Sequence, residues 1–114
     1  MDNSADKGDD SVICELRTYH VLPGKMHEYS QVFGEFVMPV FKKLGFNVIG
    51  VWQTVIGESD EFTYLLAFDD LADRDAKFKA LSAEPAMLPY RQQPTRVSHI
   101  TNKILAPQPY SPLK

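Results

Sequence analysis

Two histidines in apolar segments are the first residues whose chemistry suggests a function. His20 ends an alternating segment that begins at Val12, and His99 lies inside a similar segment near the C-terminus. Because imidazole titrates nearest neutral pH, we predict that His20, His99 or both border a pocket between a sheet and helices and act as catalytic groups that move a proton. The alternative is that each is a hydrogen-bonded histidine of the core or its rim. His27 falls on the polar side of a predicted helix and is interpreted as solvated.

Arg17 is a second candidate, because a guanidinium matches the geometry of a carboxylate. Glu15 lies two residues before it, on the same face of an alternating segment, so the two side chains are close enough to pair. They pair either with each other or with a second copy of the chain, as buried polar groups normally do. The functional alternative is that Arg17 anchors the carboxylate of a ligand, which requires a cavity beside it.

Aromatic residues with one polar atom form a third group of candidates. Together with Arg17, we predict that Tyr19, Trp52 and Tyr64 bind a ligand, because apolar walls with a few polar groups are typical of small-molecule cavities. Rings at these positions also fill ordinary protein cores, so packing is the alternative.

Motifs for metals, phosphates and nucleophilic catalysis are missing from the sequence. It contains no His-x-x-x-His or Glu-x-x-His pair, and its glycines at 45, 50 and 57 are isolated instead of forming a phosphate-binding loop. No Ser-His-Asp or Cys-His set can be assembled from the order of the residues. The sequence therefore predicts neither a metal nor a cofactor.

Changes in hydrophobic period give the elements that position these residues. The predicted strands span 12–22, 46–56, 61–69 and 96–105, and the predicted helices span 25–44 and 71–83. Pro39 lies inside the first helix, so we expect a kink or a break near Val37 and Met38. Asp70 is a predicted N-cap of the second helix. Residues 86–95 contain two prolines and are interpreted as a loop or a short helix.

The order strand, helix, strand, strand, helix, strand predicts a ferredoxin-like α+β fold, in which two helices cover one face of a four-stranded antiparallel sheet. In the first strand, Cys14, Leu16, Thr18 and His20 share one face, and Ile13, Glu15, Arg17, Tyr19 and Val21 share the other. The uncovered face of the sheet is largely apolar. Because such a surface is normally an interface, we predict a symmetric dimer whose sheets pack face to face.

The chain divides into three parts. Residues 1–11 are acidic and polar, so they cannot bury enough apolar area to offset the entropy of ordering and are predicted to be disordered. Residues 12–105 form the predicted domain. Residues 106–114 contain three prolines and are predicted to form an extended tail.

Charge and hydropathy limit the possible partners. The net charge is −3 with no basic stripe, so nucleic acid is not an expected partner. No stretch approaches the roughly 20 apolar residues of a membrane span, and the acidic start is unlike a signal peptide. Cys14 is the single cysteine, which fits a reducing compartment. We expect a cytoplasmic protein.

Three segments resemble the NIPSNAP family in order and spacing: "ELRTYHVLPGKMHEYSQVF", "GVWQTVIGESDEFTYLLAFDDLADRDA" and the terminal "PYSPL". Each is a weak signal alone, and together they are fairly specific and cover the chain from Ile13 to Leu113. The resemblance implies a dimeric α+β barrel, a fold also used by cofactor-independent monooxygenases, some small cyclases and haem-binding proteins. It implies no single reaction, because a fold does not fix a function.

Three functions remain open at this point. In the first, the protein binds a small apolar or aromatic molecule in a pocket between sheet and helices. In the second, it is a cofactor-independent enzyme of the monooxygenase, cyclase or isomerase type, acting on an aromatic or polyketide-like substrate. In the third, it is a scaffolding dimer recruited through its tail.

Overall fold

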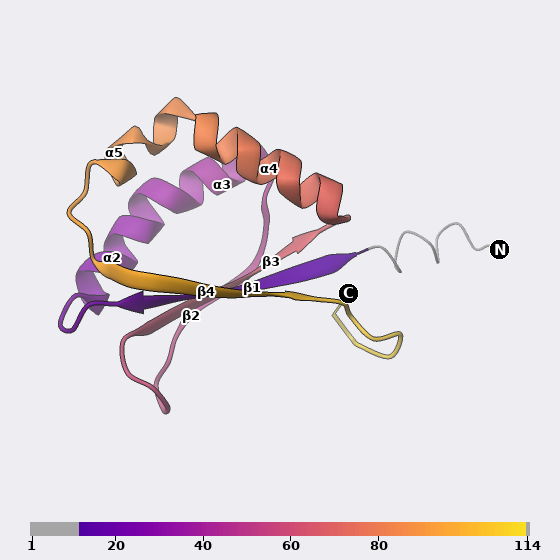
Figure 1. Cartoon of the computed structure of the whole chain (residues 1–114), viewed down its shortest axis with the longest axis horizontal. Coiled ribbons are helices and arrows are strands. Elements are labelled where there is room, and N and C mark those ends of the chain that lie inside the picture. The colour runs from indigo at the N-terminus through magenta and orange to yellow at the C-terminus, as the bar shows by residue number, and fades with distance from the viewer. Residues whose placement is uncertain (1–11, 114) are drawn as a thin grey trace.

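A four-stranded antiparallel sheet with the helices on one side forms the fold of the computed structural model, which describes residues 12–113 (Figure 1). The strands lie in the order β2-β3-β1-β4. Their bounds are Ile13–Val21 for β1, Asn47–Gln53 for β2, Glu61–Phe68 for β3 and Val97–Leu105 for β4. This confirms the predicted ferredoxin-like α+β fold. The predicted disordered segment, 1–11, lies outside the described residues.

The first helical region is continuous but not uniform. It consists of α2 (Met26–Val32), the π-helical turn η1 (Phe33–Val37) and α3 (Met38–Leu44). Pro39 sits in the first turn of α3, where its missing N–H costs least, and the wider π turn directly precedes it. The predicted disturbance near Val37 and Met38 is therefore confirmed. Gly45 ends α3 in the left-handed conformation, with φ of 81°.

The second helical region covers the sheet less completely. Asp70 caps α4 (Leu71–Ala83) by accepting a hydrogen bond of 2.7 Å from the Asp73 N–H, as predicted. α4 has no fully buried residue, and its contribution to the core is limited to the partly buried Phe78 and Leu81. Two short helices follow where a loop or short helix is expected, η2 (Pro85–Met87) and α5 (Leu88–Arg91).

The two faces of the sheet differ in burial. On β3, every second residue is buried against the helices: Phe62, Tyr64, Leu66 and Phe68. Tyr19 and Val21 of β1 join them, and Phe33 and Phe41 pack on them from the helices. The opposite side of the sheet, called here the open face, has no helix over it in Figure 1.

The edges of the sheet depart from expectation at two places. β2 ends at Gln53 because the hairpin turn begins at Thr54, whose N–H donates to the Glu61 carbonyl. The predicted strand 46–56 is therefore too long. Val55 and Ile56 lie in the turn and are almost fully exposed. Where an extended tail is expected, the chain turns at Gln108, whose carbonyl accepts from the Ser111 N–H at 2.9 Å.

Candidate functional site

A carboxylate with no exposed surface organises the middle of the helix-covered face. Glu15 of β1 accepts hydrogen bonds from Arg17 at 2.7 Å, from Arg74 of α4 at 2.7 and 3.3 Å, and from Asn102 of β4 at 2.9 Å. The predicted pairing of Glu15 with Arg17 is therefore present within one chain. Burial alone would raise the pKa of Glu15, but the bonds from Arg74, Asn102 and Arg17 outweigh it and hold the pKa below its ordinary value.

Arg17 connects this carboxylate to a group of phenols. Its Nε donates to the Tyr64 hydroxyl at 3.0 Å, and that hydroxyl bonds with the Tyr19 hydroxyl at 2.8 Å. The guanidinium also lies 5.0 Å from the centre of the Phe78 ring. Burial alone would lower the pKa of Arg17, but the oxygens of Tyr64, Tyr19 and Glu15 raise it above its ordinary value. Arg17 therefore remains a cation inside an aromatic environment.

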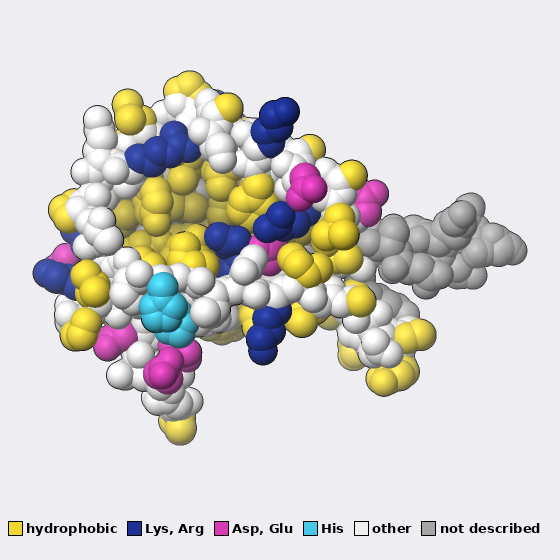
Figure 2. All heavy atoms as spheres, in the orientation of Figure 1, with side chains coloured by type: hydrophobic (Ala, Val, Ile, Leu, Met, Phe, Trp, Pro, Cys, Tyr) yellow, Lys and Arg dark blue, Asp and Glu magenta, His cyan; other side chains and the backbone are white. Residues whose placement is uncertain are grey.

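A cavity of about 140 Å³ lies beside Arg17, between the sheet and the helices. Its walls are Arg17, Tyr19, Phe33, Val37, Phe41, Tyr64, Phe78, Leu81, Met87 and Tyr90. Figure 2 shows apolar side chains deep in a hollow between the β4 edge and the helices, with basic side chains at its border. This feature is called here the Arg17 cavity.

The cavity exists because the second helical region, from α4 to α5, covers only part of the sheet. Ile100 and Ile104 of β4 point to the helix side, since they pair with Tyr19 and Glu15, yet they are 47% and 44% exposed. The helices thus do not extend over β4. Tyr90 of α5 partly closes the gap, with its hydroxyl bonded to that of Tyr29 at 2.8 Å, and it also lines a neighbouring hollow of about 180 Å³.

Two phenols of the cavity, those of Tyr64 and Tyr90, have raised pKa values. Burial raises the pKa of Tyr64, and the adjacent Tyr19 raises it further, while Arg17 acts in the opposite direction. Burial also raises the pKa of Tyr90. At neutral pH these hydroxyls therefore serve as neutral hydrogen-bonding groups beside a cation.

The structure brings some of the predicted site residues together and separates others. Arg17, Tyr19 and Tyr64 meet at the Arg17 cavity. Trp52 pairs with Thr63 and lies 52% exposed on the open face, where its ring covers Gly50. His20 and His99 also lie on the open face, as neighbours in register whose rings stack at 4.0 Å and 5°. They therefore do not border the pocket between sheet and helices.

Sequence reasoning missed Arg74, Asn102 and Tyr90. Arg74 could have been found from the sequence, because it lies at the helical spacing of the apolar residues of its helix and so on their side. Asn102 could not, because it reaches Glu15, 87 residues away in the sequence, only through the pairing of β1 with β4. A further group was not expected either: His20, Glu58 and Glu61 place three possible metal-ligand atoms within 4.8 Å of one another. No sequence motif links these three residues.

Fold and site together define a ferredoxin-like α+β protein with a cationic, aromatic cavity under its helices. The family model NIPSNAP matches residues 14–112, and the chain belongs to the NIPSNAP family. A comparison with curated proteins finds no match.

Solved structures of NIPSNAP proteins share the fold over nearly the whole chain. A NIPSNAP family protein of Agrobacterium tumefaciens is 26% identical, with a TM-score of 0.85 over 90% of this chain and 99% of that one. An uncharacterized NIPSNAP-like domain protein of Burkholderia xenovorans is 28% identical, with a TM-score of 0.83 over 90% of each chain. A second Agrobacterium tumefaciens protein, of unknown function, is 27% identical, with a TM-score of 0.82 over 92% of this chain and 96% of that one.

Proposed function

We propose that this protein binds one small apolar or aromatic molecule that carries an acidic group, and that the Arg17 cavity holds it. The observation that carries this proposal is a cationic guanidinium in the wall of a cavity otherwise built from rings and aliphatic side chains. Apolar walls with a few polar groups are the usual design of a ligand site.

Charge supports an acidic ligand. Glu15 brings one negative charge against the two positive charges of Arg17 and Arg74. Arg74 also pairs with Asp75, but the Asp75 side chain is 72% exposed, so water screens that pair. A guanidinium has five N–H donors, and the bonds to Glu15 and Tyr64 use two of them. Donors therefore remain for a ligand carboxylate.

Size supports a molecule of about one ring. The volume of about 140 Å³ is close to that of apolar cavities that hold benzene, about 150 Å³. Phe33, Tyr64 and Phe78 offer ring faces and edges for stacking on such a molecule. A larger ligand would need Tyr90 to move, because Tyr90 separates this cavity from the next hollow.

The chemistry of the lining favours binding over proton transfer. The pKa values of Tyr64 and Tyr90 are raised, and Arg17 stays charged, so these groups orient a ligand rather than exchange protons with it. The alternative, a cofactor-independent enzyme with His20 and His99 as acid and base, would need its substrate on the open face. Binding in the Arg17 cavity requires no cofactor.

The test is calorimetric titration of the protein with benzoate and, in parallel, with benzyl alcohol, which has a similar ring and no charge. We expect saturable binding of benzoate that is stronger than that of benzyl alcohol, and a loss of this preference in Arg17→Met. Glu15 keeps Arg74 and Asn102 in that variant, so the fold should survive. The matched control is Lys42→Met, an exposed cation of α3. Equal affinity of Arg17→Met for benzoate would contradict the proposal.

We also propose that two copies assemble through their open faces, as a dimeric α+β barrel. Leu16 and Leu65 pair across β1 and β3 in the middle of this face, and Trp52 lies on the same side with half its surface exposed. Burying these side chains would gain free energy from the removal of apolar area from water. A scaffolding role would use the same dimer.

The oligomeric state tests this assembly. We expect the mass of a dimer in sedimentation equilibrium and the mass of a monomer for Leu65→Lys, because a charge on the pairing face would have to be buried without a partner. Lys42→Glu, an exposed position of α3 on the helix side of the sheet, is the control that should leave the dimer intact. A wild-type monomer at all concentrations would contradict the assembly.

A cytoplasmic location is part of the proposal, supported by the free thiol of Cys14, which is buried. None of the helices within residues 12–113 is long and apolar enough to cross a membrane.

A further inference from the structure

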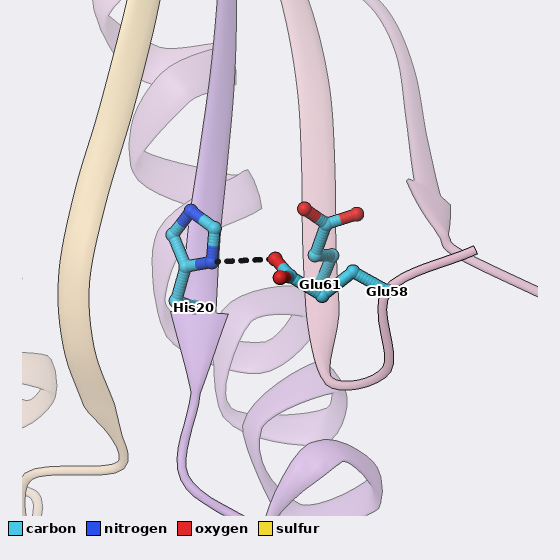
Figure 3. A group of neighbouring side chains, drawn as sticks. All are labelled: His20, Glu58 and Glu61. Carbon is cyan, nitrogen blue, oxygen red and sulfur yellow. Dashed lines mark ion pairs between the residues drawn. The ribbon is translucent and has the colours of Figure 1, made fainter.

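Three potential metal ligands converge at the end of the open face where the β2–β3 hairpin turns (Figure 3). His20 and Glu61 are direct partners in the pairing of β1 with β3, so their side chains share one side of the sheet. Glu58 reaches toward them from the hairpin, with an oxygen 3.7 Å from Nδ1 of His20. Each residue offers one ligand atom, and these atoms all lie within 4.8 Å of one another.

Two threonines contact His20 and Glu61 and orient their side chains. The Thr101 hydroxyl lies 3.4 Å from Nε2 of His20, so it can accept the Nε2 proton and leave the Nδ1 lone pair facing the carboxylates. The Thr54 hydroxyl donates to Oε1 of Glu61 at 3.0 Å. A hydrogen bond on the second nitrogen of a histidine, or on a ligating carboxylate, is the arrangement that positions ligands around metals in proteins.

The backbone around the group is fixed on both sides. The Val21 N–H donates to the Asp60 carbonyl at 2.8 Å, and the Thr54 N–H donates to the Glu61 carbonyl at 3.1 Å, which closes the base of the hairpin against β1. The ring of His99 stacks on that of His20 and restricts its rotation. Glu58, with a side chain that is 70% exposed, is the ligand that is free to adjust.

From this arrangement we propose that His20, Glu58 and Glu61 bind one divalent transition-metal ion of the Zn²⁺ or Co²⁺ class. Two carboxylates and a neutral imidazole give a charge of −2 that complements the ion, and the imidazole nitrogen favours these ions over Mg²⁺ and Ca²⁺. Three protein ligands leave a fourth position for water.

The ligand atoms must move closer together to bind an ion. With metal–ligand bonds of about 2.1 Å in a tetrahedral arrangement, two ligand atoms lie about 3.4 Å apart. Atoms at the outer limit of 4.8 Å would therefore approach by about 1.4 Å, a shift to which the exposed Glu58 side chain can contribute by changing its rotamer. The site is independent of the Arg17 cavity, since the two lie on opposite faces of the sheet.

The experiment is titration of chelator-treated, dialysed protein with Zn²⁺ by calorimetry and with Co²⁺ by visible absorption. We expect one ion per chain, and a Co²⁺ spectrum of nitrogen and oxygen ligands without thiolate charge transfer. Glu58→Gln, on the exposed hairpin, should fold normally and lose at least about tenfold in affinity, the loss typical even of outer-shell changes. Thr101→Val should lose about tenfold through the tautomer of His20.

Matched controls separate this site from other donors. His27→Ala and Glu35→Gln remove an exposed imidazole and an exposed carboxylate from the first helical region, and both should bind Zn²⁺ as the wild type does. Absence of saturable binding to the wild type, or wild-type affinity in Glu58→Gln, overturns the proposal. A thiolate band in the Co²⁺ spectrum also overturns it, because it would place the ion at Cys14.

Discussion

The two faces of the sheet carry polar groups in opposite ways. Under the helices, Glu15 has no exposed surface and four hydrogen bonds, and Arg17 sits among rings. On the open face, His20 and His99 are accessible to water and have fewer polar partners: His20 lies 3.4 Å from Thr101 and 3.7 Å from Glu58, and His99 lies 2.9 Å from Ser98. Polar groups that leave water must be fully partnered, whereas those that keep it need not be. The covered face therefore holds its polar side chains in fixed positions, and the open face leaves its polar side chains accessible to water.

The largest effect is expected from the aromatic core of the covered face. Phe33 is 2% exposed and lies within ring contact of Tyr19, Tyr29, Phe41, Phe62 and Tyr64. Phe33→Ala should lower the free energy of unfolding by about 4 kcal/mol, because it leaves a cavity in the core. Urea denaturation measures the change. Val55→Ala, at an almost fully exposed position, is the control. A similar loss of unfolding free energy in that variant would contradict the claim that burial sets the cost.

The second effect concerns the buried carboxylate. Glu15→Gln should lower the free energy of unfolding by about 3 kcal/mol, since Arg17 and Arg74 would lose their counter-charge in a partly buried place. Glu28→Gln, whose side chain is 47% exposed and pairs with Lys25 and Arg96, should lower the urea midpoint far less. Equal midpoints for the two variants would show that the Glu15 cluster is not stabilising.

The same carboxylate predicts a dependence on pH. Because the folded state lowers the pKa of Glu15, the stability it provides is present above its unfolded pKa, near 4.5, and is lost as the pH falls through the folded value. The difference in unfolding free energy between wild type and Glu15→Gln should thus shrink as the pH is lowered below 4.5. Urea titrations at a series of pH values test this, and a constant difference would contradict it.

A smaller effect is expected on the open face at Gly50. A Cβ at this position would approach the Trp52 ring to 2.5 Å, so the indole must move. Gly50→Val should cost about 1–2 kcal/mol by overpacking. Trp52 is the single tryptophan, so its fluorescence reports the displacement directly. An unchanged emission spectrum would mean that the ring does not cover Gly50.

The smallest effects are expected from the stacked histidines. His20→Ala and His99→Ala should fold and should bind benzoate as the wild type does, because both rings lie away from the Arg17 cavity. Calorimetry measures the affinity. Weaker binding in either variant would instead support the hypothesis that these histidines serve the pocket.

Local patterns in the sequence were sufficient to predict the elements. Changes in hydrophobic period predicted the strand that became β3 and the helix that became α4, and Asp70 predicted where α4 begins. The shared face of Glu15, Arg17 and Tyr19 followed from the period of a strand. Trp52 could not be assigned to a face in the same way, because the register of β2 shifts between Val48 and Gly50.

By itself the sequence determined the order of elements, the ferredoxin-like fold and the family, since each depends on periods and caps within a short stretch of chain. Only the tertiary structure decided which groups meet. Arg74 and Asn102 reach Glu15 across 59 and 87 residues, and Glu61 reaches His20 through the register of β1 with β3. The incomplete cover of β4, which opens the Arg17 cavity, likewise depends on where the helices end in space. Such contacts leave no local periodicity, because they join residues that become neighbours only when the sheet forms.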